Sequence, residues 1–394
     1  MRSLLKNRNF LLLWGGQTVS ALGTWINFVG LNLYVLDVFG SGRILGSFLV
    51  VRMLPAIFFG PLGGYLADKF SRRTIMVTCD IARAVLVLGF LLTRNLWAFM
   101  FLGMALSSID KVFQATQRSF LPNVVPKEEL VEANAAWRMS TSLTTVIGPA
   151  VGGFLVSVYS YPVVFLVDAL TFVFSVICTL LITVTGQVKK AKKGSAAHEF
   201  GLVVTFFKTR VALLFLTIAR VIDAVGSGAY NTSLPLFSKV LAKGLGGVYG
   251  WLIGAWAFGQ FLGAYIVTKL LKKLSDHKEA FFTLGVVLMA LGMGGTFHCT
   301  TLAFAMLAIF VGGFGDGMSN VLFNTVLMAE APDETRGKIF GTLTALIYTA
   351  VALGMAGTGF FLDFFTMRAV TNGATAFIII GVVLGFLAYI RRDK

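Results

Sequence analysis

The chain consists mainly of apolar runs that are each long enough to cross a lipid bilayer. A membrane-spanning helix needs about 20 predominantly apolar residues, and about twelve such runs fit within the 394 residues. Charged residues make up only 13% of the chain, whereas a soluble domain carries about 25%. We therefore predict an all-α membrane protein with about twelve transmembrane helices. The predicted spans are 10–38, 46–67, 74–93, 97–118, 133–158, 161–185, 211–238, 246–270, 279–297, 300–329, 336–362 and 373–390.

Lysine and arginine residues are concentrated in every second loop between the predicted spans. About 23 of them lie on the side of the N-terminus and about five on the opposite side. Because basic loops stay in the cytoplasm, we predict a multi-pass protein of the bacterial inner membrane whose termini are both cytoplasmic. The net charge of +15 then reflects this topology and does not indicate nucleic-acid binding.

The sequence also reads as two similar halves joined by a basic linker, QVKKAKKGSAAHEF at 187–200. At an offset near 206, Asp110 falls on Asp316 and Gly148 falls on Gly354. Both halves begin inside and contain an even number of spans, so they form parallel repeats, with a site expected at the interface of the halves. The predicted division is a first six-helix bundle at 1–186, a linker at 187–207 and a second six-helix bundle at 208–394.

A signature of small and charged residues follows the second predicted span, in GGYLADKFSRR. Its key residues are Gly64, Asp68, Lys69, Arg72 and Arg73. The segment resembles the loop signature of the major facilitator superfamily, a family of two-bundle transporters that work by alternating access. In that family the acidic residue gates the cytoplasmic side through charge contacts. The resemblance implies this role for Asp68, with Arg118 as its partner.

A glycine-rich segment, VIGPAVGGFL, lies in the fifth predicted span. Glycine lets helices approach closely, and proline bends a helix and frees a carbonyl group. The residues concerned are Gly148, Pro149, Gly152 and Gly153. The segment resembles the glycine–proline motif of the drug:proton antiporter branch, which is associated with export. Flanking segments such as RMLPAIFFGPLGG and LPNVVPKEELVEAN resemble the macrolide-efflux and siderophore (enterobactin) exporters of that branch.

Polar side chains recur on one face of the first, fourth, seventh and tenth predicted spans. Ionisable groups inside a bilayer cost a few kcal/mol each, so they are candidates for function. The family resemblance places these four spans around the central cavity, and we expect Arg52, on the second span, to pair with a cavity carboxylate. The predicted substrate-cavity residues are Gln17, Ser20, Thr24, Asn27, Lys111, Gln114, Gln117, Arg220, Ser227, Tyr230, Asn320, Asn324 and Arg52.

Four intramembrane aspartates are candidates for proton coupling. In order of preference they are Asp316, Asp110, Asp223 and Asp80. A neighbouring cation opposes protonation of a carboxylate, and Asp316 ranks first because its own stripe contains no basic residue. A structural role remains an equal alternative, with Asp316 bound to Arg220 and Asp80 bound to Arg83. We expect Asp168, near the end of its span, to face the lipid headgroups.

Together these features predict a secondary active transporter, a proton-coupled exporter of a drug or siderophore. Its driving force would be the proton gradient, without a cofactor, and its partners would be the small-molecule substrate and membrane lipids. The alternatives are a translocator of lysophospholipid or other lipids, and a membrane sensor on a transporter fold. No zinc spacing, phosphate loop or catalytic nucleophile motif is present, so we predict neither an enzyme nor a metal site. We expect a monomer.

The charge asymmetry predicts that tags at Lys190 and at the C-terminus are both cytoplasmic, whereas a tag near Thr371 is outside. Labelling of intact cells with a membrane-impermeant reagent should therefore reach only the tag near Thr371. Opposite accessibility of the tags at Lys190 and the C-terminus would contradict the predicted topology.

Overall fold

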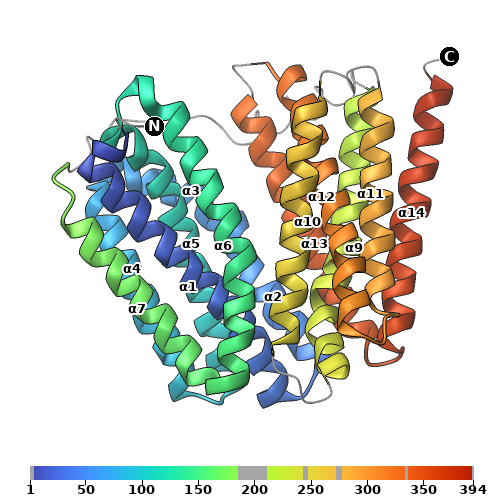
Figure 1. Cartoon of the computed structure of the whole chain (residues 1–394), viewed down its shortest axis with the longest axis horizontal. Coiled ribbons are helices and arrows are strands. Elements are labelled where there is room, and N and C mark those ends of the chain that lie inside the picture. Colours follow the sequence, from blue (N-terminus) through green and yellow to red (C-terminus); the bar gives the residue numbers. More distant parts are fainter. Residues whose placement is uncertain (1–3, 185–210, 243–246, 272–276, 333–335, 393–394) are drawn as a thin grey trace. The chain divides into compact units, whose positions relative to one another are not determined.

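The protein is described by a computed structural model that covers residues 4–184, 211–242, 247–271, 277–332 and 336–392. These residues form helices and connecting turns, and none of them lies in a strand. The helices, drawn in Figure 1, are η1 Leu4–Lys6, α1 Arg8–Phe39, α2 Gly42–Met53, α3 Pro55–Lys69, α4 Arg72–Leu92, α5 Leu96–Val124, η2 Lys127–Glu129, α6 Leu130–Tyr159, α7 Tyr161–Leu180, α9 Val211–Ala242, α10 Val248–Leu270, α11 Lys278–Thr296, α12 Leu302–Glu330, α13 Arg336–Phe361 and α14 Met367–Arg392.

Local signals explain where the first helices begin and end. The Asn7 side chain accepts a hydrogen bond from the Phe10 N–H and caps α1, which satisfies a donor that has no partner inside the helix. Gly40 ends α1 in the left-handed conformation, at φ 65°, which glycine adopts without strain. Asn95 caps α5 in the same way as Asn7 caps α1.

The predicted count of about twelve spans is confirmed by the helices of the structure. Ten described helices are long and apolar enough to cross a membrane. The second predicted span is divided at Leu54 into α2 and α3, because Pro55 begins α3 and has no N–H to donate to the preceding turn. In α14, 367–383 forms a shorter apolar helix. Thr371 lies inside α14 and is fully buried, so an outer tag belongs in the preceding turn, 362–366.

The described helices belong to two compact units. Unit 1 contains α1, α3 to α7 and the beginning of α10, up to Gly254, while unit 2 contains most of α2, the rest of α10, and α9 and α11 to α14. Each unit therefore includes one segment from the other half of the sequence, Ser41–Val50 in unit 2 and Gly244–Gly254 in unit 1. The linker predicted at 187–207 lies outside the described residues, so the domain boundaries stay a prediction.

Glycines allow both of these segments to pack closely. In unit 1, a Cβ atom on Gly250 would lie 2.0 Å from the carbonyl oxygen of Pro149, on α6. In unit 2, a Cβ atom on Gly46 would lie 2.9 Å from the carbonyl oxygen of Met355, on α13. Any larger residue would force the backbones apart, so glycine is required where each segment packs.

Within unit 1, α1 packs against both α6 and α7. A Cβ atom on Gly152 of α6 would lie 2.7 Å from the carbonyl oxygen of Ile26, and one on Gly148 would lie 2.5 Å from the Cβ of Trp25. Gly148 and Gly152 are four residues apart and share one face of α6, and this face meets α1. Backbone contact of this kind substitutes for the hydrophobic effect, which does not act between helices in lipid.

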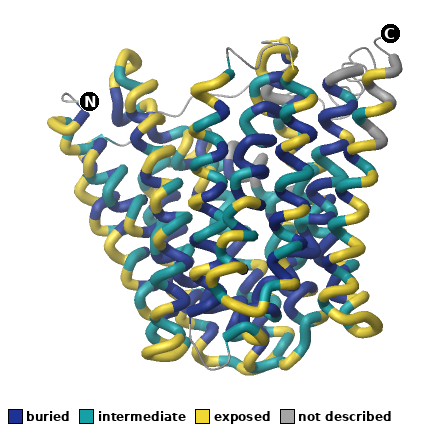
Figure 2. The backbone as a smooth tube through the Cα atoms, turned by 45° about the vertical axis from the view of Figure 1, so that its right-hand side comes forward, coloured by how far each residue is buried: buried dark blue, intermediate teal, exposed yellow. Residues whose placement is uncertain are grey.

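The side of α7 that faces away from the unit is apolar and exposed. Buried and exposed residues recur along the helices with the helical period, as Figure 2 shows. The exposed large side chains of α7 are Leu166, Leu170, Val173, Phe174, Ile177 and Leu180. Such a stripe would be unfavourable in water but suits a helix surrounded by lipid tails. The opposite face of α7 is the one that contributes polar groups to the interior.

We predict that Gly152→Leu destabilises the protein, because its side chain would be forced into the backbone of α1. Overpacking of a well-packed interior costs about 1–3 kcal/mol or more. Gly15→Leu is the matched control, since no atom lies within 4 Å of a Cβ atom built on Gly15. Thermal unfolding of the purified variants should show a lower midpoint for Gly152→Leu alone. Equal midpoints for both variants would contradict the observed packing.

Candidate functional site

A buried arginine organises the polar interior of unit 1. Asp80 and Arg83 lie one helical turn apart on α4 and therefore share a face, and Arg83 donates to Asp80. Arg83 Nη1 also donates to Oδ1 of Asp110, on α5, at 3.1 Å. The side chains of Asp80 and Arg83 are almost fully buried, and that of Asp110 is 18% exposed. One cation is thus shared by two carboxylates.

Two amides and a hydroxyl extend this contact across four helices. Ser175 of α7 donates to Oδ2 of Asp80 at 2.7 Å, and Gln17 of α1 donates to Ser175 Oγ at 2.7 Å. Gln117 of α5 donates in turn to Gln17 Oε1 at 2.8 Å. The polar chain therefore starts on α5, crosses α1, α7 and α4, and returns to α5 at Asp110.

Aromatic rings hold the guanidinium group of Arg83 in place. Its central carbon lies 3.8 Å from the centre of the Phe113 ring and 4.5 Å from that of Phe172. A cation over an aromatic face is attracted by the ring, more strongly where water is excluded. A planar guanidinium can stack on rings and bind two carboxylates at once, which a lysine ammonium group does poorly.

Unit 2 contains a second arginine between two aspartates. Arg220 and Asp223 form an ion pair within α9, and Arg220 Nη1 lies 3.4 Å from Oδ1 of Asp316, on α12. Asp316 also accepts hydrogen bonds from Gln260 of α10, at 2.7 Å, and from Asn320, at 3.1 Å. Asp316 ranked first as a coupling residue because its stripe lacks a basic residue, but Arg220 supplies that cation from α9.

The two clusters contain the same types of charged residue, and some of these residues occupy equivalent positions in the two repeats. Asp110 and Asp316 occupy equivalent repeat positions, on α5 and α12, and each binds an arginine that also binds a second aspartate. The arginines come from non-equivalent helices, α4 for Arg83 and α9 for Arg220. With all groups ionised, each cluster holds two negative charges and one positive charge. Each would therefore gain from binding a proton or another cation.

The other predicted cavity residues are more dispersed. Thr24 and Asn324 donate to carbonyl groups of their own helices, and Ser227 lies 3.8 Å from the sulfur of Met289. Tyr230 is fully buried and bonded to Thr375, so it belongs to the core of unit 2 and not to a cavity wall. Ser20 is buried on α1, Lys111 is partly buried, and Gln114 is exposed on α5.

Arg52 and Asn27 lie near a carboxylate that the sequence placed wrongly. Asp168 was expected at the lipid headgroups, but it is fully buried on α7. It was misplaced because sequence position alone does not give the direction in which a helix faces. Asn27 is its polar neighbour on α1, and Arg52 interacts electrostatically with Asp168 and Asp110. Arg52 also lies over the ring of Phe28, at 5.9 Å.

The loop signature ties α4 to its neighbours through its basic residues. Arg72 donates to the carbonyl oxygen of Ser119 at 2.7 Å and to Oδ1 of Asn123 at 2.6 Å, both at the end of α5. Arg73 donates to the carbonyl oxygen at Leu180, the end of α7. Lys69 is exposed near the ring of Tyr65, 5.9 Å away. The surroundings of Gly64 and the side chain of Asp68 lie outside the described part of the structure, and Arg118 is exposed.

Sequence reasoning missed four contributors to the clusters. Gln260, an amide inside a predicted span, met the same criterion as Gln17 and could have been found. Ser175 gave no signal, because single serines are common in helices, and the aromatic partners Phe113 and Phe172 are two of 37 phenylalanines. Within the described ranges, no group of three His, Cys, Asp or Glu residues could hold a metal ion.

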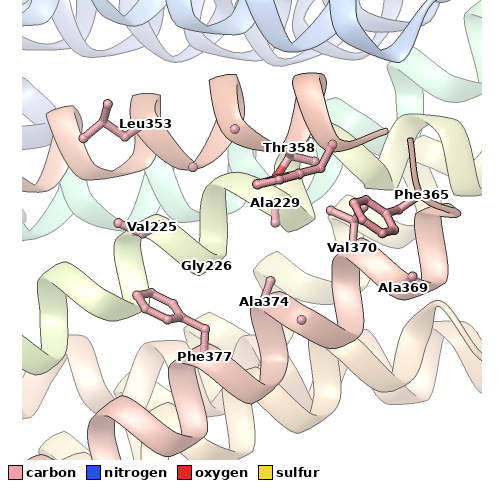
Figure 3. A pocket seen from close by; sticks show the side chains of 14 residues that line it. Val225, Gly226, Ala229, Leu353, Thr358, Phe365, Ala369, Val370, Ala374 and Phe377 are labelled. Atoms are coloured by element: carbon pink, nitrogen blue, oxygen red, sulfur yellow. The ribbon is translucent and has the colours of Figure 1, made fainter. Parts of the chain in front are cut away.

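Unit 2 also contains an apolar groove between α13 and α14, with α9 at its base. Its volume is about 550 Å³. Figure 3 shows Val225 and Gly226 of α9 at the base, with Leu353 of α13 and Phe377 of α14 on either side. Leu353 and Phe377 are about half exposed or more, so the groove opens on the surface of the unit. Thr358 supplies the hydroxyl group among otherwise apolar lining side chains.

Comparison with known proteins gives matches along nearly the whole chain. Residues 13–248 and 217–394 match the Major Facilitator Superfamily. The Staphyloferrin A transporter of Staphylococcus aureus is 21% identical over 82% of this chain and 82% of its own length. Macrolide efflux protein A of Streptococcus pyogenes is 23% identical, over 90% and 89%. A Na⁺, Li⁺, K⁺/H⁺ antiporter of Planococcus maritimus is 24% identical, over 87% of both.

Solved transporters share the fold. The crystal structure of the nucleoside transporter NupG matches with a TM-score of 0.75, covering 98% of this chain and 99% of that one. The sequence identity is 14%, so this likeness concerns the fold alone.

We predict that Arg83→Gln strongly destabilises the protein. Removing one partner of a buried ion pair costs about 3–5 kcal/mol, because the remaining charge is left uncompensated. The double variant Asp80→Asn/Arg83→Gln should recover part of this loss, since it leaves one buried carboxylate instead of two. Arg94→Gln, at an exposed arginine in the turn before α5, is the control. The thermal unfolding midpoints of the two single variants should differ. Equal midpoints for Arg83→Gln and Arg94→Gln would show that the Arg83 cluster does not stabilise the fold.

Proposed function

Because the chain belongs to the Major Facilitator Superfamily, we propose that it exports a small organic molecule from the cytoplasm in exchange for protons. The protein is a multi-pass membrane transporter and not an enzyme. Its resemblance to efflux and siderophore transporters is confirmed by relatives that align with more than four fifths of the chain. Proton coupling, the direction of transport and the substrate are the proposed parts.

The observation that carries the proposal is the charge balance of the two aspartate–arginine clusters. Each cluster has one carboxylate more than it has arginines, within helices that cross the membrane. An uncompensated charge is costly in this environment, so binding of a proton or a cationic substrate would stabilise either cluster. If the proton and the substrate compete for the same carboxylates, the movement of one is coupled to the movement of the other.

The proton gradient is a sufficient source of energy. One proton moving through about 100 mV supplies about 2.3 kcal/mol, and no cofactor is needed. Among the relatives, the Planococcus maritimus protein is by name an antiporter that uses H⁺. We place both termini in the cytoplasm and the chain in the bacterial inner membrane, on the basis of the Lys and Arg distribution. We propose that it works as a monomer.

A drug or a siderophore is the proposed substrate class. Two relatives are a macrolide efflux protein and a Staphyloferrin A transporter, and the glycine–proline segment resembles that of exporters. The gating role implied for Asp68 would act next to Arg72, which anchors the same loop to α5. Charge contacts at this loop would favour one access state over the other.

The groove in unit 2 favours one second candidate, the translocation of lysophospholipid. Lipid entry requires a lateral opening, and the groove is apolar and open on the unit's surface. This alternative does not explain the excess carboxylates, because an acyl chain is uncharged and cannot neutralise them. We therefore rank lipid translocation second.

Transport into inside-out vesicles tests the proposal. A macrolide and Staphyloferrin A, each radiolabelled, should accumulate in vesicles that contain the protein only when the lumen is more acidic than the medium. A protonophore should abolish the accumulation, because it removes the driving force. Vesicles without the protein are the control. Translocation of labelled lysophospholipid without accumulation of either compound would favour the second candidate, and accumulation that ignores the pH gradient would refute proton coupling.

A further inference from the structure

Asp168 is a fully buried carboxylate outside both arginine clusters. It lies on the interior face of α7, between Phe165 and Phe172, both of which are also buried. On the α1 side the packing leaves no spare room, because a Cβ atom on Gly23 would lie 2.8 Å from Oδ1 of Asp168. Asp168 is therefore in contact with neither water nor the lipid headgroups.

Neither oxygen of Asp168 has a hydrogen bond of good geometry with a described residue, and the side-chain amide of Asn27 is the polar group that lies close to it. In this respect it differs from the clustered aspartates. Protonating Asp80, Asp110 or Asp316 would weaken a contact with an arginine. Protonating Asp168 would weaken only its contact with the Asn27 amide and its longer-range attraction to Arg83 and Arg52. Burying a polar group without partners lowers the stability of a protein. The burial of Asp168 therefore indicates a functional role and not a structural one.

The charged groups around Asp168 come from several elements of unit 1. Arg83 of α4, Asp110 of α5 and Arg52, at the end of α2, all interact with it electrostatically, and Asn27 faces it from α1. The ion pairs of Arg83 are with Asp80 and Asp110. The carboxyl group thus lies within the field of the Arg83 cluster without being bound to it.

Arg83 has a hydrogen-bond donor to spare. Its Nε–H is buried and has no acceptor among the described residues, although both terminal nitrogens are engaged. A modest movement that brought this donor to Asp168 would satisfy one unpartnered group on each side. Asp110 and Asp168 would then compete for the same guanidinium group, which gives the cluster two alternative pairings.

We propose that Asp168 is the carboxyl group of unit 1 that takes up and releases the coupling proton, with Arg83 as its partner once the proton has left. The inference rests on the proposed proton-coupled function. A proton from the outer medium binds an Asp168 oxygen, and the Arg83–Asp110 contact is kept. Release of that proton to the cytoplasm leaves a carboxylate, which draws Arg83 away from Asp110. The exposed part of Asp110 is then free to bind a cationic group of the substrate.

The test compares Asp168→Asn with the wild type in reconstituted vesicles, using a labelled macrolide as the probe. Asparagine carries no charge that could draw Arg83 away from Asp110, so Asp168→Asn should slow macrolide exchange between equal pools and lose accumulation driven by a pH gradient. Asp363→Asn is the control, because Asp363 lies in a turn outside the cluster and pairs with Arg43. It should behave like the wild type in both assays.

The outcomes separate this inference from the proposed function. Wild-type protein that shows no gradient-driven accumulation would refute proton coupling as such. Wild-type and Asp168→Asn proteins that both accumulate macrolide would refute the role of Asp168 alone. If Asp168→Asn does not insert into the membrane, Asp168→Glu decides the question. That variant keeps a carboxyl group and should stay coupled with a shifted pH dependence, and an unchanged pH profile would overturn the inference.

Discussion

The structure depends on the contact of Arg83 with Asp80 and Asp110, which places three charges inside a membrane-spanning bundle. A charge in this environment is tolerated only when it is paired and its remaining hydrogen-bonding capacity is used. Phe113 and Phe172 cover the guanidinium group, while Ser175 and Gln17 carry the contact to α7 and α1. The relative positions of four helices are therefore fixed by one cation and its partners.

Close backbone contacts complement this polar centre. Lipid tails are as apolar as leucine, so apolar side chains gain little from leaving them, and packing depends on how near two helices can approach. Gly152 brings α6 against the backbone of α1, and Gly250 brings α10 against Pro149. Glycine contacts are short but carry no charge, so they can separate and re-form at little electrostatic cost. The charged contacts instead give each unit a small set of discrete pairings, which a switch requires.

Much of this architecture could be predicted from hydropathy and local spacing, and the rest depended on long-range partners. The spans follow from apolar runs, and the contact of Asp80 with Arg83 follows from their separation of three residues. The link from Arg220 to Asp316 joins α9 to α12, and nothing within either helix specifies it. The burial of Asp168 depends on how α7 is rotated against α1. Rotation is set by packing of both helices, so a single segment does not reveal it.

The central claim is that carboxyl groups of this polar interior exchange protons when substrate binds. Its most direct test is the pH change of a weakly buffered solution of the purified protein when a macrolide is added. The account predicts that binding releases protons into the medium, that the release disappears in alkaline solution, where the carboxyl groups are already deprotonated, and that binding weakens in acidic solution. Saturable binding of the macrolide with no proton released at any pH would contradict it.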